Sequence, residues 1–313
     1  MTAGSNVPAP GPDAVLTRSA EGLVVGATSP EATCAFLGAF GLVEAGTREV
    51  GPGEATALYG LDRVTTETRL VTPGAERPAV WVVGCDRAGG LPAGFQRTAR
   101  AFDIYTWSMD EALDHLAFVG IGAGPVGTLS VGPVTMRQCL VPGPDGLAVV
   151  LVESTHRRPS LLDDGGPGGP VPLFSQGHSV VWCVERMDAE AALLVAAGLT
   201  KGIDLAFTEA EVSTYLDLPR SPVPIRMTML ADAAVDPLRL ELLEFPDDPG
   251  VTLSPPHLVG GLWALRCTVD DPGVAAATLR GAGWVAGTAA ASAHGPFVAV
   301  ATPGGVRLQL GAS

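Results

Sequence analysis

The chain has 313 residues, of which 47% are hydrophobic and 17% are charged, and its formal net charge at pH 7 is −14. This composition is typical of a soluble globular protein with room for two domains. Lys201 is the single lysine among 19 lysine and arginine residues. So acidic a chain lacks the basic face that binds nucleic acid or an anionic membrane. We therefore expect a small-molecule ligand, no nucleic-acid partner and no membrane partner.

No apolar run approaches the roughly 18 residues that a membrane-spanning helix needs. Residues 1–19 lack the basic start and apolar centre of a signal peptide, so we expect a cytoplasmic protein. Cysteine occurs at five dispersed positions without a C-x-x-C pair, a pattern typical of reduced, buried thiols rather than of disulfides or a zinc site. These cysteines are Cys34, Cys85, Cys139, Cys183 and Cys267.

A pattern of about 80 residues occurs four times, and a repeat of that length is a whole supersecondary unit. Each copy opens with a short apolar strand and an Ala-rich helix; the strands are predicted at 23–26, 102–105, 180–183 and 265–268. In the third copy, a helix at 187–197 precedes runs that alternate with the period of two typical of strands, at 205–207, 212–216, 225–230 and 238–245. The sequence therefore predicts four βαβββ modules, which we number one to four.

Two segments of the chain are predicted to lie outside the modules. Residues 1–19 are expected to be a flexible tail, and residues 157–177 a linker, because the Gly- and Pro-rich run at 163–170 supports neither helix nor strand. This predicts an N-terminal domain of modules one and two (20–156) and a C-terminal domain of modules three and four (178–313). The alternative is a cup shared by modules two and three, in which Asp103 would join Glu241 and His178.

The module openings and the turns into the final strands resemble those of the vicinal oxygen chelate superfamily, which includes glyoxalase I, bleomycin-resistance proteins and extradiol dioxygenases. One such opening is the run at 268–276, where Asp270-Asp271-Pro272 leads into an Ala-rich helix. The turns are at 143–146, 236–237 and 302–305. The resemblance covers residues 21–311 and is weakest in module one. It implies an α+β fold in which the four modules pair into two open, cup-shaped sheets.

The usual chemistry of this superfamily depends on a divalent metal in the cup, held from the opening and final strands of the modules. Most of the positions that the resemblance assigns to metal ligands cannot coordinate, which favours a metal-free site. They are Gly22, Ala101, Ser179, Ala264, Val150, Glu241 and Gln309. A strand bulge at His178 would turn its imidazole into the cup. His178, Glu241 and Gln309 would then suit one Fe, Mn, Ni or Zn ion.

Alternation along the strands indicates which polar side chains face a cup, since the opposite face must pack against helices. We predict Glu241 and His178 as catalytic residues. Predicted substrate-binding residues are Asp103 and Tyr105 in module two, Arg266 and Gln309 in module four, and Arg137, whose facing the pattern leaves open. A structural Glu–Arg pair that stiffens the sheet is an equal alternative for Glu241 and Arg266.

Three functions are compatible with these residues. The first is an isomerase- or lyase-type enzyme that acts on a small oxygenated, aromatic or polyketide-like metabolite, with Glu241 as base or metal ligand. The second is an extradiol-type ring-cleaving dioxygenase, which the four-module length favours. The third is a metal-free protein that binds an antibiotic or metabolite. Such binding proteins form dimers of two-module chains, and a homodimer of this chain is an additional expectation.

Overall fold

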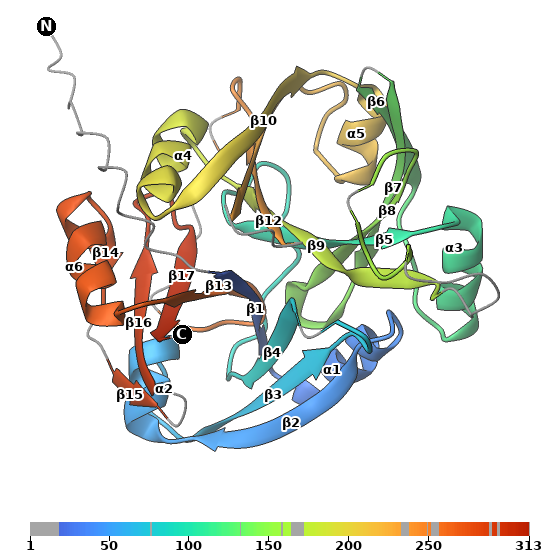
Figure 1. Ribbon diagram of the computed structural model, residues 1–313. Helices are drawn as coiled ribbons and strands as arrows, with labels where there is room; N and C mark the ends of the chain where they lie inside the picture. Colours follow the sequence, from blue (N-terminus) through green and yellow to red (C-terminus); the bar gives the residue numbers. More distant parts are fainter. Residues whose placement is uncertain are drawn as a thin grey trace, which may run out of the picture.

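The computed structural model of the chain contains two strongly curled mixed sheets flanked by helices (Figure 1). No described helix is long and apolar enough to cross a membrane. All five cysteines are free, and four of them are buried. The structure describes residues 19–75, 77–131, 133–157, 159–163, 172–232, 238–248, 250–251, 257–287, 290–292 and 295–312.

Modules one and four build one sheet and modules two and three build the other; we call them the 1/4 sheet and the 2/3 sheet. The 1/4 sheet contains, in spatial order, β14 (Val285–Ala286), β16 (Gly295–Ala301), β17 (Arg307–Ala312), β13 (Gly261–Val269), β1 (Ser19–Ala27), β4 (Ala79–Gly84), β3 (Thr65–Val71) and β2 (Val43–Val50), with β15 (Ala290–Ser292) paired to β16. The 2/3 sheet contains β10 (Leu199–Phe207), β11 (Ile225–Asp232), β12 (Arg239–Glu244), β9 (Phe174–Cys183), β5 (Ala99–Thr106), β8 (Ala148–Ser154), β7 (Val134–Pro142) and β6 (Val126–Val131).

The opening strands of the modules meet at the centre of each sheet. Strand β1 pairs antiparallel with β13, with Leu23 opposite Leu265, and β5 pairs antiparallel with β9, with Phe102 opposite Val180. The predicted grouping of modules one with two and three with four is therefore wrong, and the alternative pairing of modules two and three is confirmed. Every module offers one open edge at its opening strand, and its sequence pattern does not specify which other module covers that edge.

A helix follows each opening strand, as predicted. These helices are α1 (Pro30–Gly38), α3 (Met109–Phe118), α4 (Met187–Ala196) and α6 (Pro272–Gly281). Side chains cap three of their N-termini, because Ser29, Ser108 and Asp271 accept hydrogen bonds from backbone N–H groups of the first turn. The opening strand of each module therefore ends where its helix cap begins.

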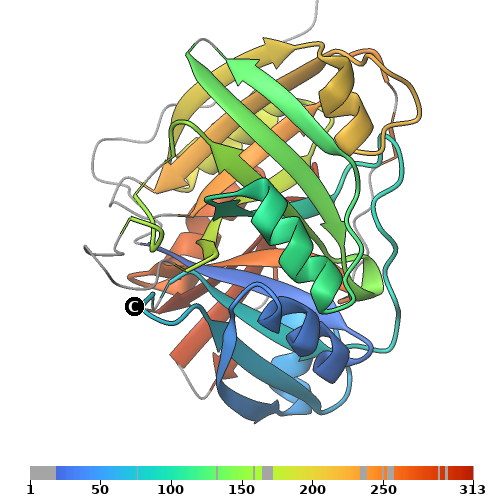
Figure 2. The ribbon, with the colours of Figure 1, turned by 90° about the vertical axis from the view of Figure 1, so that its right-hand side faces the viewer.

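One continuous hydrophobic core contains these four helices and the sheet residues that face them. The alternation predicted from the sequence is confirmed here, since Leu240 and Leu242 of β12 and Leu265 and Cys267 of β13 all lie in this core. The concave faces of the two sheets carry two separate clusters, one for each sheet. The two cups therefore share one core on their convex sides. Figure 2 shows helices α1 and α3 where the two sheets meet.

Two short helices lie on the concave faces: α2 (Pro52–Tyr59) in module one and α5 (Ala210–Tyr215) in module three. The strand predicted at 212–216 is wrong, because that segment belongs mainly to α5. Val212, Tyr215 and Leu216 follow helical spacing and pack together against the 2/3 sheet. Thr214 donates its hydroxyl to the carbonyl of Ala210 across one helical turn, 2.9 Å away. Tertiary packing outweighs the strand preference of the β-branched residues. A 3-10 turn, η1 (Pro144–Gly146), precedes β8.

Candidate functional site

The concave face of the 1/4 sheet is largely covered by its own side chains, beside a pocket of about 210 Å³ that Tyr59, Trp263 and Gln309 help to line. Helix α2 lies across it, with Leu58 and Tyr59 buried against Trp263 and Phe297. Glu67 on β3 forms a 2.8 Å ion pair with Arg266 on β13, and both side chains are buried. Arg266 lies with its guanidinium carbon 4.2 Å from the ring centre of Trp81.

Every charged group of this network has several partners. Arg266 also donates to Tyr59 at 3.0 Å and to Gln309 at 3.0 Å. Glu67 accepts from Tyr59 and, at 2.8 Å, from Arg48. Burial alone would raise the pKa of Glu67, but the charge and hydrogen bonds of Arg266, with bonds from Arg48 and Tyr59, lower it to about 2. The ion pair is therefore formed at all physiological pH values.

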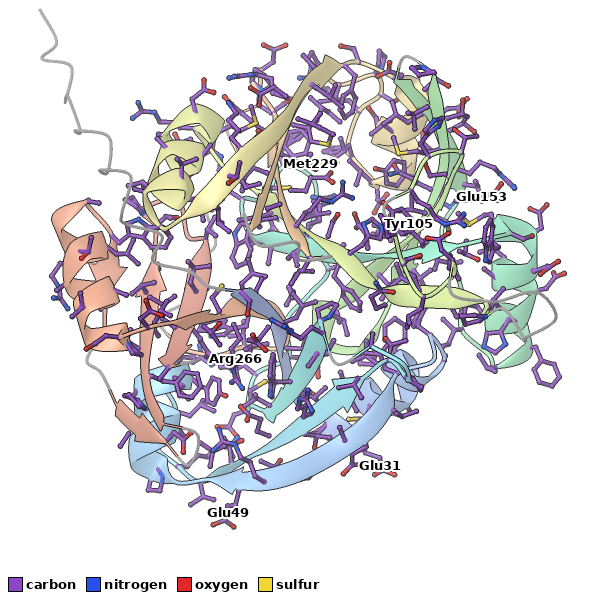
Figure 3. The ribbon with its side chains drawn as sticks, viewed as in Figure 1. Glu31, Glu49, Tyr105, Glu153, Met229 and Arg266 are labelled. Atoms are coloured by element: carbon purple, nitrogen blue, oxygen red, sulfur yellow. The ribbon has the colours of Figure 1, made fainter. Side chains whose placement is uncertain are left out.

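Arg266 and Gln309 lie away from Glu241, contrary to prediction. Figure 3 shows Arg266 in the 1/4 half of the molecule, whereas Tyr105 and Met229 lie in the 2/3 half. Gln309 accepts from Arg266 and donates to the carbonyl of Leu58 at 3.2 Å. Both side chains are thus engaged within the 1/4 sheet. The alternative of a structural Glu–Arg pair fits Arg266, but its partner is Glu67 rather than Glu241.

The concave face of the 2/3 sheet holds an open pocket of about 350 Å³. Helix α5 covers one end of this face, and the pocket occupies the rest. The walls are apolar and the floor is polar, as expected for a site that binds a small molecule. The apolar wall consists of Val134, Met136, Val152, Ile203, Leu205, Met227 and Met229. The polar floor consists of Asp103, Tyr105, Gln138, His178, Arg239 and Glu241, and Ser154, His156 and Arg157 complete the polar lining of the pocket.

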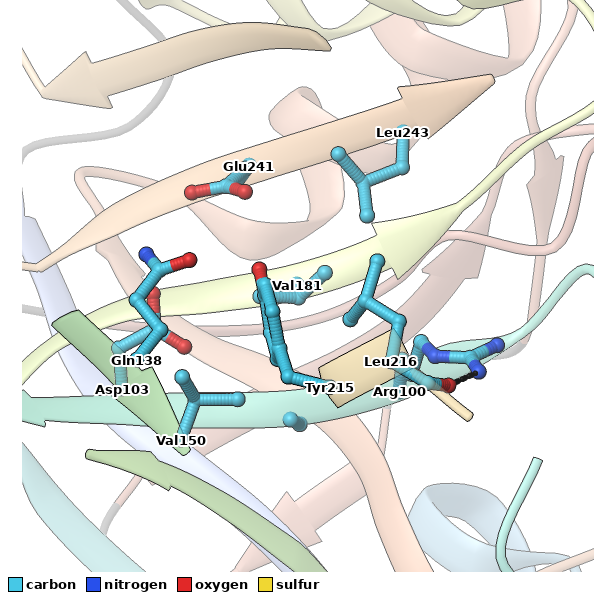
Figure 4. A pocket seen from close by; sticks show the side chains of 10 residues that line it. Arg100, Asp103, Gln138, Val150, Val181, Tyr215, Leu216, Glu241 and Leu243 are labelled. Carbon is cyan, nitrogen blue, oxygen red and sulfur yellow. Dashed lines mark hydrogen bonds between the residues drawn. The ribbon is translucent and has the colours of Figure 1, made fainter. Parts of the chain in front are cut away.

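Two carboxyl groups and one guanidinium lie on this floor. Asp103 on β5 and Arg239 on β12 both stand opposite Ser179 of β9, and Glu241 is two residues further along β12. Figure 4 shows Glu241, Asp103, Gln138 and Tyr215 around one space. Oδ1 of Asp103 and Oε1 of Gln138 are buried without a hydrogen bond. Unsatisfied buried polar atoms are uncommon in folded proteins and are frequent at functional sites.

The two carboxyl groups titrate far from their ordinary pH range. Burial, together with the negative charge of Glu241, raises the pKa of Asp103 well above its ordinary value, and the charge of Arg239 opposes this only in part. Burial raises the pKa of Glu241 to about 7, again against the charge of Arg239. Burial and both carboxylates also raise the pKa of Tyr215. Both carboxyl groups therefore hold their protons more strongly than exposed carboxyl groups do, and the midpoint of Glu241 lies near neutral pH.

A β-bulge brings His178 into the cup. Strand β9 has Ser179 opposite Asp103 but Gly177 opposite Ile104, so His178 is the extra residue. Its ring stacks on Tyr105 with centres 3.5 Å apart. Arg239 lies 3.1 Å from Nδ1 of His178, and because a guanidinium can only donate, Nδ1 accepts this bond. The bulge on which the prediction for His178 depended is confirmed, and Asp103 and Tyr105 join it in the pocket.

Arg137 does not face this cup. It lies on the other face of β7, where it pairs with Asp110 at 2.8 Å and with Glu153 at 3.1 Å. The adjacent residue, Gln138, points into the pocket instead. Sequence reasoning missed Gln138, Tyr215 and Arg100, whose Nη2 donates to the carbonyl of Leu216 at the closed end of the cup. The alternation of β7 contained the signal for Gln138, since successive strand residues face opposite sides.

The donor set does not fit the metal that this fold usually holds. The positions that the resemblance assigns in the 2/3 cup are Ala101, Val150, Ser179 and Glu241, and only Glu241 is a strong ligand. The predicted set of His178, Glu241 and Gln309 is wrong, because Gln309 lies in the other sheet. Within the described ranges, no group of three or more His, Cys, Asp or Glu side chains is arranged to hold a metal ion.

No family model and no curated protein matches this chain by sequence. Solved structures do match it over almost its whole length. Glyoxalase I from Zea mays has 16% sequence identity, a TM-score of 0.64, and a match that covers 94% of this chain and 92% of that one. A putative dioxygenase from Bacillus subtilis has 13% identity and a TM-score of 0.64, with 96% and 86% covered. Structural similarity at such low sequence identity establishes the fold, and the function has to be argued from the residues of the site. The chain therefore has the fold of the vicinal oxygen chelate superfamily, in a four-module form.

Proposed function

We propose that this chain is an enzyme that transfers a proton at a carbon atom of a small oxygenated molecule bound in the 2/3 cup. Glu241 is the general base, and the reaction is of the isomerase or lyase type. The substrate has a largely apolar body, because seven apolar side chains line the wall of the pocket.

The observation that carries this proposal is a pair of carboxyl groups on one pocket floor, of which Asp103 is buried and Glu241 is partly buried. Desolvation raises the pKa of both groups, to about 7 for Glu241, and the negative charge of Glu241 raises the pKa of Asp103 further. A general base is most effective when its pKa is near the working pH. A protonated carboxyl group beside it supplies a hydrogen-bond donor to a substrate oxygen. The two groups thus divide the roles of base and acid.

The apolar wall suits the conjugated body of an enolisable ketone or aldehyde. Met136, Met227 and Met229 contribute polarisable sulfur atoms, which pack favourably against flat, unsaturated groups. Excluding water from such a pocket strengthens each electrostatic contact within it. The substrate class that fits is therefore a carbonyl compound with an acidic C–H bond and an aromatic or conjugated neighbour.

Hydrogen–deuterium exchange tests the proposal without knowledge of the product. A panel of aryl and conjugated ketones is incubated with the protein in D₂O, and loss of the α-proton signal is followed by NMR. Exchange is expected with wild type and is expected to slow by about 100-fold or more in Glu241→Gln, since general bases contribute about 10²–10⁴ in rate. Glu244→Gln is the matched control, because Glu244 lies on the same strand but pairs with Arg226 on the other face.

A metal-free binding protein is the second candidate, favoured by the apolar wall. It predicts that compounds bind in the cup but never exchange their protons, and that Glu241→Gln has no effect on them. That result would overturn the enzymatic proposal. An extradiol-type dioxygenase is not supported by the residues present, because Ala101 and Val150 stand at positions where metal ligands are expected.

A further inference from the structure

Arg239 is a cation on the pocket floor whose bonded partners are all neutral. Its Nη2 lies 3.3 Å from the hydroxyl of Tyr105, 3.1 Å from Nδ1 of His178 and 3.1 Å from the hydroxyl of Ser179. Its Nε is buried and makes no hydrogen bond with any described residue. Among the described residues, no carboxylate oxygen lies within 4.0 Å of a guanidinium nitrogen of Arg239, the distance that defines an ion pair. Arg239 is partly buried, whereas the fully buried arginine of the 1/4 cup, Arg266, has such a carboxylate in Glu67.

This arrangement holds the guanidinium in place while leaving donors available. The stacked rings of Tyr105 and His178 and the Ser179 hydroxyl fix one nitrogen of the fork. Cations removed from water are nearly always paired with an anion or with several acceptors, and the partly buried Arg239 has acceptors at only one of its nitrogens. A planar guanidinium with a free edge is also the side chain best suited to bind an anionic oxygen.

We propose that Arg239 binds the anionic oxygen that forms on the substrate when Glu241 removes a proton from the neighbouring carbon. This inference rests on the proposed function and names the group that stabilises its intermediate. In most proteins of this fold a metal ion is implied in that role, and here the donor set does not fit a metal. The substrate class is accordingly a carbonyl compound whose enolate, or whose phenolate analogue, fits beside Arg239.

The charges and electrons balance within the site. The C–H bond breaks and its proton goes to the Glu241 carboxylate. The electron pair forms a carbon–carbon double bond, and the former carbonyl π pair moves onto oxygen as the enolate. One negative charge thus moves from Glu241 to the oxygen beside Arg239, and the total charge of the pocket is unchanged. Return of the proton to the opposite face of the same carbon, or to the far carbon of a conjugated dienolate, completes an isomerisation, with no oxidant or reductant.

Binding of 4-nitrophenol tests this directly, because its phenolate and phenol forms absorb at different wavelengths. With wild type, the bound probe is expected to be ionised at a pH where the free probe is mostly neutral. Arg239→Met is expected to weaken phenolate binding by about 10- to 100-fold, the usual effect of a charge-assisted hydrogen bond. Nitrobenzene has the same shape without the charge, and its binding is expected to change by less than about threefold in the same variant.

Matched variants keep the test decisive. Arg226→Met removes an arginine that pairs with Glu244 and Asp188 outside the pocket, and it is expected to leave phenolate binding unchanged. Arg239→Lys keeps the charge without the planar fork and should bind phenolate with intermediate affinity. Unchanged nitrobenzene binding shows that each variant is folded around an intact pocket.

Several outcomes would overturn the inference. They are a neutral bound probe in wild type, equal phenolate affinity in wild type and Arg239→Met, or an equal loss in Arg226→Met. These results are distinguishable from failure of the proposed function. If ketones bind without proton exchange but 4-nitrophenol still binds as an Arg239-dependent phenolate, the anion site stands and the enzymatic proposal does not.

Discussion

Replacement of Glu241 by glutamine should stabilise the protein relative to wild type, and this gain in stability should be larger at alkaline pH than at acidic pH. Burial raises the pKa of Glu241 from an ordinary value of 4.5 to about 7. The folded state therefore holds its proton over a pH range in which the unfolded state has already lost it. Stability from this group is fully present below about pH 4.5 and is lost as the pH rises toward 7.

The magnitude follows from the size of the pKa change. Each pH unit between the two pKa values corresponds to about 1.4 kcal/mol, so ionised Glu241 destabilises the fold by about 3 kcal/mol above pH 7. Roughly 2 to 3 kcal/mol of this falls between about pH 5 and about pH 8. Glutamine does not titrate. The free energy of unfolding of Glu241→Gln, relative to that of wild type, should therefore rise by this amount from about pH 5 to about pH 8.

Urea denaturation of both proteins at about pH 5 and about pH 8 measures the difference. The groups that face Glu241 are Asp103, Tyr215 and Arg239. Because the charge of Glu241 also raises the pKa of Asp103, Glu241→Gln lowers that pKa too, and the change in stability has the same sign for both carboxyl groups. Glu244→Gln is the control, and because its ion pair with Arg226 is half-exposed, it should change stability by less than about 1 kcal/mol at either pH. A stability difference between wild type and Glu241→Gln that is the same at both pH values would refute a raised pKa at this site.

Three further predictions concern the other parts of the molecule. Glu67→Gln should lower the free energy of unfolding by about 3–5 kcal/mol in urea titrations, because it leaves the Arg266 cation buried without its carboxylate; Arg266→Met should lower it less, since Arg48 still neutralises Glu67. Met229→Trp fills the pocket and should abolish binding of 4-nitrophenol and nitrobenzene alike while the near-UV circular dichroism stays native; retained binding would place the ligand elsewhere. Asp145→Ala removes bonds from the backbone N–H and hydroxyl of Thr28, which join the two sheets, and should cost about 1–3 kcal/mol by the same urea assay, whereas Asp145→Asn should cost less.

The module pattern and the facing of strand residues were predictable from the sequence. Alternation placed Asp103 and Tyr105 on one side of β5 and Glu241 on one side of β12, and the structure has them on the pocket floor. This succeeds because a strand exposes successive side chains to opposite faces, which is a local property of the chain. The superfamily fold followed from the same local features, repeated four times.

The pairing of modules was not predictable in the same way. A pattern of apolar and polar residues specifies a face, but it does not specify which edge lies beside which. Arg266 and Gln309 were therefore assigned to the wrong cup. The bulge at His178 is also invisible to alternation, because it breaks the period of two on which alternation depends.

Other residues were missed because they lie in parts of the modules without a recognised motif. Tyr59 and Tyr215 end the short helices on the two concave faces, and one of these helices was predicted as a strand. Glu67 lies at a buried position of β3, where alternation with Thr65 carried the signal. A charged residue in the buried phase of a strand is a useful marker, because it must be paired or functional.

Comparison of the two sheets row by row shows how the polar residues of the two cups differ. In the 2/3 sheet one row across the four central strands reads Arg239, Ser179, Asp103 and Val150. The same row of the 1/4 sheet reads Ala79, Gly22, Arg266 and Gln309. Two residues further along the final strand, Glu241 corresponds to Trp81. The 1/4 cup thus carries its cation in place of Asp103 and an aromatic ring in place of the base.

The difference in polar satisfaction between the two cups argues that the open one is retained for a ligand. In the 1/4 cup, Arg266 and Glu67 satisfy one another together with Tyr59, Gln309 and Arg48, so a ligand would have to break existing bonds. In the 2/3 cup, Asp103, Gln138 and Arg239 each keep a buried polar atom without a bond, at about 1–3 kcal/mol apiece. The same fold satisfies such groups internally in its other half. Their persistence beside an apolar wall therefore favours binding of a molecule with complementary oxygen atoms over a purely structural role.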